Sequence, residues 1–131
     1  MTLEDIRRAA DCLASEAGRT VDVIDQGNGM VAVLVRDVPT SVEKGWRKTV
    51  DLIMNVNVDF PRTGFEQTGF YVIPPNFADG AASPQSCADA TLPNVGPCKR
   101  FSWSPKNLPG GEDLRPFYRW MLGRLFMPGA T

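Results

Sequence analysis

The sequence predicts an α+β domain that begins with a helix, continues as a four-stranded antiparallel meander and a long loop, and ends with a second helix. Three observations support this order. Apolar residues recur at helical spacing near both ends, β-branched runs alternate with polar residues in the first half, and residues 74–105 are rich in Pro, Gly, Ala, Ser and Asn. The 131 residues suit one domain, 1–131, because a chain of this length buries roughly two-thirds of its unfolded surface.

The first helix is expected near residues 3–16. Thr2 and Asp5 have the spacing of a capping box, and Gly18 is a natural helix stop. Cys12 lies inside this helix, where its small side chain is expected to pack as an apolar group. The apolar positions that recur three or four residues apart are Leu3, Ile6, Ala10 and Leu13.

Turn residues and alternation mark the strands that follow. The segment QGNG, residues 26–29, separates two β-branched runs and has the composition of a hairpin turn. Residues 49–60, TVDLIMNVNVDF, alternate apolar and polar side chains, which is typical of a half-buried antiparallel strand. The segment GFYVI, residues 69–73, is expected to form a further short strand.

The long loop, residues 74–105, contains Cys87 and Cys98. It is expected to carry function, because long irregular segments in small domains are usually functional or disordered. The last helix is expected after Glu112 and Asp113, whose charges favour a helix N-terminus. Its apolar face would consist of Leu114, Phe117, Tyr118, Met121, Leu122 and Leu125.

Composition removes several classes of function. The 14 basic and 15 acidic residues give a net charge of −1, so neither nucleic acid nor a membrane is expected as a partner. The absence of histidine excludes a Ser-His-Asp triad, a Cys-His dyad and a His-ligated zinc site. Three cysteines without a CxxC pair argue against a disulfide framework, and no cofactor or metal is expected. Without a signal peptide or membrane span, the chain is predicted to be soluble and cytoplasmic, with reduced thiols.

Several short motifs resemble those of the ubiquitin-conjugating enzyme (UBC-like) family. LPN, residues 92–94, is similar to the family's His-Pro-Asn tripeptide, with Leu in the His position. WSP, residues 103–105, matches a tripeptide that follows the catalytic cysteine in many members, and Phe60-Pro61 resembles a proline-containing turn between two strands. The GFY segment and the acidic pair before the last helix are similar to divergent bacterial members. The resemblance implies a UBC-like fold and a bacterial conjugating enzyme, of a family with a suggested role in anti-phage defence.

The resemblance also implies roles for particular residues. Cys98 would carry a ubiquitin-like modifier as a thioester and transfer it to a target amine, a step that suits a thiol because it accepts and releases acyl groups. Asn94 would stabilise the oxyanion, with Asn76 as the competing asparagine. Cys87 is the rival nucleophile. The implied partners are a ubiquitin-activating-like enzyme, the ubiquitin-like modifier and a protein target.

Charged neighbours could assist this chemistry. Lys99 and Arg100 follow Cys98 directly, and a cationic pair lowers a thiol pKa when it faces the sulfur. Asp89 and Asp113 are candidates for helping the attacking lysine lose its proton. The alternative to Lys99-Arg100 as activators is an ordinary solvated basic pair.

Two further functions compete with the conjugating enzyme. One is a catalytically inactive UBC-like adaptor or protein-interaction module, which would keep the fold without a thioester. The other is a small α+β interaction or structural protein whose likeness to the family is accidental. In the second case Cys98 would be a packing residue of the loop.

Overall fold

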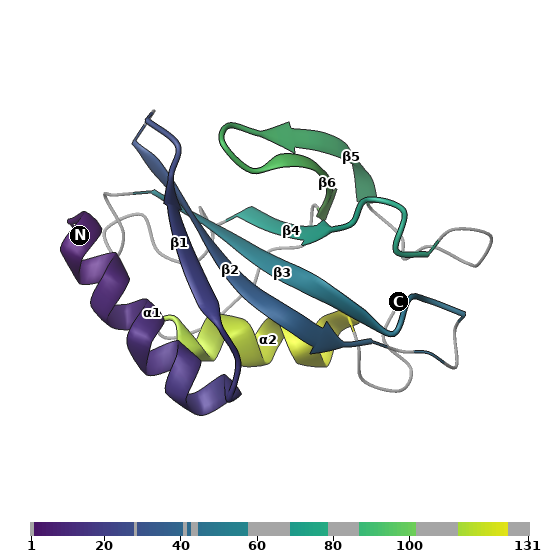
Figure 1. The fold of residues 1–131 in the computed structure, drawn as a ribbon, viewed down its shortest axis with the longest axis horizontal. Coiled ribbons are helices and arrows are strands. Elements are labelled where there is room, and N and C mark those ends of the chain that lie inside the picture. Colours follow the sequence, from purple (N-terminus) through teal and green to yellow (C-terminus); the bar gives the residue numbers. More distant parts are fainter. Residues whose placement is uncertain are drawn as a thin grey trace.

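The structure, a computed structural model, describes residues 2–27, 29–40, 42, 45–57, 69–78, 87–101 and 113–125. Within these residues the chain forms one six-stranded antiparallel sheet and two helices (Figure 1). The elements are α1 (Leu3–Ala17), β1 (Val21–Asp25), β2 (Met30–Pro39), β3 (Thr49–Asn57), β4 (Gly69–Ile73), β5 (Cys87–Leu92), β6 (Gly96–Phe101) and α2 (Arg115–Leu125). The strands are ordered β1-β2-β3-β4-β6-β5 across the sheet, so that β5 and β1 are its two end strands.

Helix α1 begins and ends where the sequence predicts. The Asp5 amide donates to the Thr2 hydroxyl at 3.2 Å and the Thr2 amide donates to the Asp5 carboxylate at 2.9 Å, which completes a capping box. Gly18 ends the helix with a φ of 65°, a conformation that costs other residues about 1–2 kcal/mol. The face that packs on the sheet consists of Ile6, Ala9, Ala10 and Leu13.

The first four strands form the predicted meander. In the turn between β1 and β2, Gly27 and Gly29 have φ values of 76° and 82°, which the QGNG composition allows at little cost. Arg36 of β2 then connects three neighbouring strands through ion pairs, at 2.8 Å to Asp22 of β1 and 2.9 Å to Asp51 of β3.

The predicted long loop is wrong, because residues 87–101 within it form the hairpin β5–β6. Strand β6 extends the sheet by pairing with β4, from Phe70 opposite Phe101 to Val72 opposite Lys99. The local sequence does not predict this hairpin, because it contains Pro93 and Pro97 and lacks β-branched alternation. The evidence for it is the pairing of β6 with β4. The UBC-like fold class, with its four-stranded sheet and several helices, is therefore wrong for this chain.

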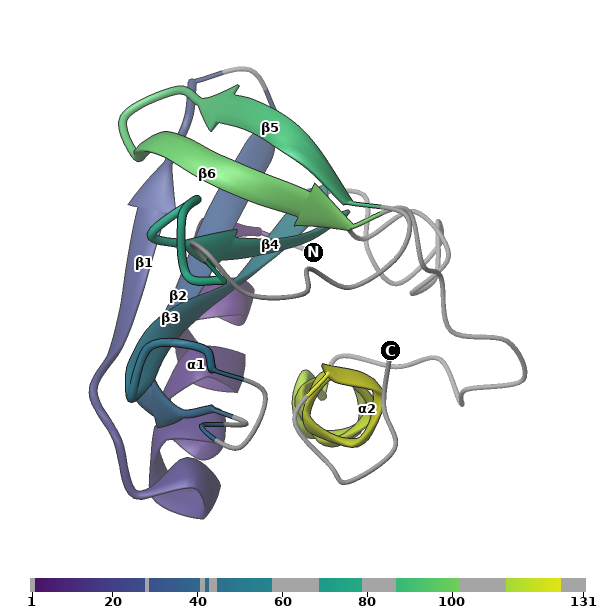
Figure 2. The ribbon, with the colours of Figure 1, turned by 90° about the vertical axis from the view of Figure 1, so that its right-hand side faces the viewer.

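Both faces of the sheet are covered. The two helices pack on one face against the main core, and Figure 2 shows α2 end-on on the same side as α1. The hairpin covers part of the other face and forms a second core with the sheet, which consists of Ala32, Leu34, Ile53, Leu92 and Cys98. The Asn94 side-chain amide donates to the Asp25 carbonyl at 3.1 Å, so the tip of the hairpin reaches back to the end of β1.

This second core corrects one further expectation. Strand β3 was predicted to be half-buried, but Ile53 and Asn55 on its supposedly polar side are 0% and 9% exposed. The reason is that the hairpin folds over that side of β2 and β3. Residues 58–60 of the predicted strand lie outside the described residues.

Helix α2 closes the main core. The Arg115 amide donates to the Asp113 carboxylate at 3.0 Å at the start of the helix, and Arg119 reaches Glu16 of α1 in an ion pair. The buried residues of α2 are Phe117, Tyr118 and Met121, and Leu114, directly before the helix, is buried as well. With 15 residues in α1 and 11 in α2, neither of the described helices is long and apolar enough to cross a membrane.

Candidate functional site

The predicted nucleophile Cys98 lies inside the second core. Its side chain is 0% exposed and packs in the cluster that includes Leu34, Ile53 and Leu92. Burial raises the pKa of the Cys98 thiol, and a hydrogen bond from the Leu92 backbone only partly offsets this effect. A thiol that is protonated and covered is poorly placed to attack an acyl group.

Of the two basic residues that follow Cys98, Lys99 does not face its sulfur. Consecutive side chains of a strand point to opposite faces, so Lys99 lies on the other side of the hairpin from Cys98. There the Lys99 ammonium forms a 2.7 Å ion pair with Asp89, its direct partner in β5. Lys99 is thus used within the hairpin, where its ammonium pairs with the Asp89 carboxylate.

Asn94 occupies the turn of the hairpin. Asn94 follows Pro93 in the chain and has a φ of 61°, and the Val95 amide donates to the Leu92 carbonyl at 3.1 Å. This arrangement is typical of a type II turn. The Asn94 side chain bonds to the Asp25 carbonyl. At a strand rise of ~3.3 Å per residue, Asn94 and Cys98 are on the order of 10 Å apart. The described geometry therefore does not place the Asn94 amide at the Cys98 sulfur.

The rival nucleophile Cys87 lies at the opposite end of the hairpin. It pairs with Phe101, while Cys98 pairs with Ala90, so the two thiols stand three residue pairs apart. Cys87 packs against the main core and Cys98 belongs to the second core, which puts them on opposite faces of the sheet. The competing Asn76 is exposed beyond β4, and Trp103 and Pro105 of the WSP motif lie outside the described residues.

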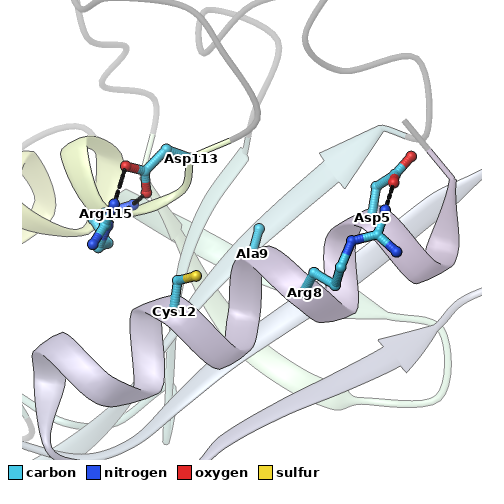
Figure 3. Close-up of a pocket in the computed structure, with 6 residues that line it drawn as sticks. All are labelled: Asp5, Arg8, Ala9, Cys12, Asp113 and Arg115. Carbon is cyan, nitrogen blue, oxygen red and sulfur yellow. Dashed lines mark hydrogen bonds and ion pairs between the residues drawn. The ribbon is translucent and has the colours of Figure 1, made fainter.

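A cleft between α1 and the start of α2 contains the exposed thiol of the chain, Cys12 (Figure 3). Its volume is about 350 Å³, and we call it the interhelical cleft. The prediction that Cys12 packs in the core is wrong, because the buried face of α1 passes beside it. The residues that line the cleft are Asp5, Arg8, Ala9, Cys12, Asp113 and Arg115.

The charges of the interhelical cleft are paired within it. Arg8 forms an ion pair with Asp5, and Arg115 forms one of 2.8 Å with Asp113 (Figure 3). Hydrogen bonds from Arg115 lower the pKa of Asp113, and those from Thr2 lower the pKa of Asp5. Asp113 is therefore held as a carboxylate and is a poor proton acceptor for an incoming lysine.

The sequence contained a signal for this cleft. Asp5, Arg8 and Cys12 follow one another at intervals of three and four residues, which places them on one side of a helix. That side lies next to the buried residues Ile6 and Leu13, so its side chains can contact a segment that packs beside the helix. The position of α2, which no local pattern predicts, turns this side into a cleft.

The outer end of the sheet forms a second candidate region. Strand β5 pairs with β6 on one side, and no described strand pairs with its other side. Next to it lies a hollow of about 400 Å³, here the β5 hollow, which is bordered by Pro75, Asp89, Ala90, Thr91, Pro97 and Cys98. Asp89 and Thr91 are exposed on β5, so this strand offers backbone and polar side chains to an approaching chain.

A search for metal-ligand clusters and comparisons with known proteins give no further candidate site. Among the residues that the structure describes, no three His, Cys, Asp or Glu side chains come together as a group that could hold a metal ion. No family model matches the chain, and no curated protein or solved structure matches it. The function must therefore be argued from the geometry alone.

Proposed function

We propose that this chain is a protein-interaction module that binds an extended segment of a partner protein along β5. The observation that carries the proposal is the outer side of this end strand, whose backbone N–H and C=O groups pair with no strand among the described residues. The other end strand is a poorer site, because α1 packs beside β1 (Figure 1). Strand addition gains affinity from main-chain hydrogen bonds and specificity from alternate side chains of the added segment.

Two features of the hairpin support binding in preference to thioester chemistry. A thioester on Cys98 would require the C-terminus of a modifier to reach a sulfur that is 0% exposed. The raised pKa of the Cys98 thiol also leaves little thiolate near neutral pH. The packing of Cys98 and the hydrogen bond of Asn94 in the turn give both residues a role that needs no catalysis.

The partners implied by the resemblance remain candidates within this proposal. A ubiquitin-activating-like enzyme, a ubiquitin-like modifier or a modified target could each supply the extended segment. A cytoplasmic location of the chain belongs to the same proposal. In each case the chain would hold its partner without forming a covalent bond to it.

A charging assay separates this proposal from the conjugating enzyme. The protein is incubated with ATP and with any activating-type enzyme and ubiquitin-like protein encoded beside its gene, and the products are resolved without reductant. We expect no adduct on the protein while the activating enzyme charges itself. A thiol-sensitive adduct that disappears in Cys98→Ala, and persists in Cys87→Ala and Cys12→Ala, would establish the thioester carrier and refute the binding module.

A peptide selection tests the binding site itself. Random linear peptides displayed on phage are selected on the protein and then tested against Thr91→Pro and Thr91→Val. Proline removes a backbone N–H on the open side of β5, where an end strand tolerates it, whereas valine keeps that N–H. Peptides that bind the unaltered protein and Thr91→Val but do not bind Thr91→Pro would support strand addition. Equal binding to all three would place the site elsewhere.

A further inference from the structure

We infer that the partner of β5 is a second copy of this chain, joined by antiparallel pairing of β5 with its symmetry mate around Ala90. This inference rests on the proposed function, since it names the occupant of the same strand. The pairing would continue one six-stranded sheet into the next across a twofold axis. Figures 1 and 2 both place the hairpin at the end of the molecule away from α1 and α2, so neither helix obstructs a second copy.

The backbone groups that face outward can be identified from the hairpin. The Leu92 carbonyl accepts the Val95 amide inside the turn, so the backbone groups of Leu92 face β6. The backbone N–H and C=O groups of consecutive strand residues point to alternate sides of the strand. Those of Thr91 and Asp89 therefore face away from β6. The partner of Thr91 in β6 is Pro97, which has no N–H to donate to Thr91. This agrees with backbone groups of Thr91 that face away from β6.

Asp89 and Thr91 allow three symmetric registers, centred on either residue or on Ala90 between them. In a pairing centred on Asp89, the two Asp89 carboxylates would stand directly opposite each other, which is destabilising. In a pairing centred on Thr91, Asp89 would face Pro93 of the second copy, which cannot donate a hydrogen bond. Only the pairing centred on Ala90 sets Asp89 against Thr91 on both sides of the axis, with four backbone hydrogen bonds.

The side chains of β5 fit this register. Asp89 is 84% exposed despite its ion pair with Lys99, so its carboxylate can accept a hydrogen bond from the Thr91 hydroxyl of the second copy. Ala90 meets its own mate at a site without backbone hydrogen bonds, where strands approach most closely and a small side chain is favoured. The Ala90-centred register thus pairs each Asp89 carboxylate with a Thr91 hydroxyl of the other copy, and it places the small side chain of Ala90 on the twofold axis.

The interface is short, and this sets its expected strength. Four backbone hydrogen bonds and two side-chain contacts must offset the loss of translational and rotational freedom on association. We therefore expect a reversible dimer whose population rises with protein concentration. Sedimentation analysis over a concentration series measures it, and Thr91→Pro should weaken dimerisation by about tenfold because two hydrogen bonds are lost. Thr91→Val, which keeps both, is the matched control.

Cysteine cross-linking tests the register independently of affinity. In a background of Cys12→Ser and Cys87→Ala, Asp89→Cys and Thr91→Cys proteins carrying tags of different mass are mixed and mildly oxidised. Opposed residues of hydrogen-bonded pairs have Cα atoms about 5.5 Å apart, within disulfide range. The Ala90-centred register predicts a mixed disulfide, and Thr91→Cys alone should not cross-link efficiently. Self-linking of Thr91→Cys in place of the mixed disulfide would show another register and overturn the inference.

The combined outcomes distinguish the two proposals. A monomer at all concentrations, without the mixed disulfide but with peptides that depend on the Thr91 amide, overturns self-pairing and keeps the interaction module. Absence of the dimer, the disulfide and such peptides overturns both. If Thr91→Pro fails to fold by circular dichroism, the mixed disulfide decides alone, since its substitutions keep every backbone N–H of β5.

Discussion

Cys12, Cys87 and Cys98 occupy three different environments, and these environments set what each thiol can do. Cys12 is exposed in the interhelical cleft, Cys87 is partly buried at the start of β5, and Cys98 is covered by the second core. A thiol that is covered reacts only after local opening of the structure, whatever residues adjoin it in sequence. For this reason the motif around Cys98 was a weaker guide to reactivity than its burial.

We predict that Cys12 reacts first with a thiol reagent. In the native protein, an aromatic disulfide reagent should modify Cys12 at least on the order of 100-fold faster than Cys98, because Cys98 must wait for an opening reaction. Time-resolved absorbance with peptide mapping measures both rates, and Cys12→Ser should remove the fast phase. Equal rates for Cys12 and Cys98 would contradict the buried position of Cys98.

The raised pKa of Cys98 also predicts a dependence of stability on pH. In the unfolded chain the thiol ionises near its ordinary pKa of about 8.5, whereas in the folded chain it keeps its proton to higher pH. The unfolded state then holds fewer protons, so the free energy of unfolding falls as pH rises above that value, by at most about 1.4 kcal/mol per pH unit.

Urea denaturation under reducing conditions, at neutral and at alkaline pH, measures this effect. Cys98→Ala should lose less stability than the unaltered protein over the same pH range. Tyr118 also has a pKa raised by burial, but it titrates at higher pH and is present in both proteins. Identical pH slopes for the two proteins would show that Cys98 titrates alike in the folded and unfolded states.

At the scale of elements, how well the sequence predicted each one depends on where its stability originates. The capping box and Gly18 define α1 locally, and the QGNG turn with the β-branched runs around it defines β1 and β2. The hairpin β5–β6 has no such local pattern, and its strands exist because β6 pairs with β4. Asn94, read from sequence as an oxyanion residue, belongs to the turn that makes this pairing possible.

A comparison of two substitutions at Asn94 separates the two contributions of this turn residue. Asn94→Ala should lower the free energy of unfolding by about 2 kcal/mol, because alanine tolerates a φ of 61° less well than asparagine and loses the hydrogen bond to Asp25. Asn94→Gly loses only the hydrogen bond and should cost about 1 kcal/mol or less. Chemical denaturation measures both, and a larger loss for Asn94→Gly would contradict the turn assignment.

At the scale of the whole molecule, two cores share one sheet. Val33 and Leu52 face the helices, while Leu34 and Ile53, their neighbours on β2 and β3, face the hairpin. The sequence predicted the first of these cores from the alternation of β3. It could not predict the second, because nothing local shows that the hairpin tip returns to Asp25. The candidate regions follow the same division, since the interhelical cleft and the open side of β5 both depend on contacts between distant segments.

Because β2 and β3 belong to both cores, we predict that the cores unfold together. Leu34→Ala removes a fully buried side chain from the second core and should lower the free energy of unfolding by about 2–5 kcal/mol. Its transition should remain single, with far-ultraviolet circular dichroism coinciding with the fluorescence of tryptophans such as Trp46, which lies in the main core. Phe117→Ala, a matched substitution in the main core, should produce the same cooperative transition. If Leu34→Ala instead changed the dichroism at a lower urea concentration than the fluorescence, the hairpin and its core would be a separate unit, docked on a sheet that is stable without it.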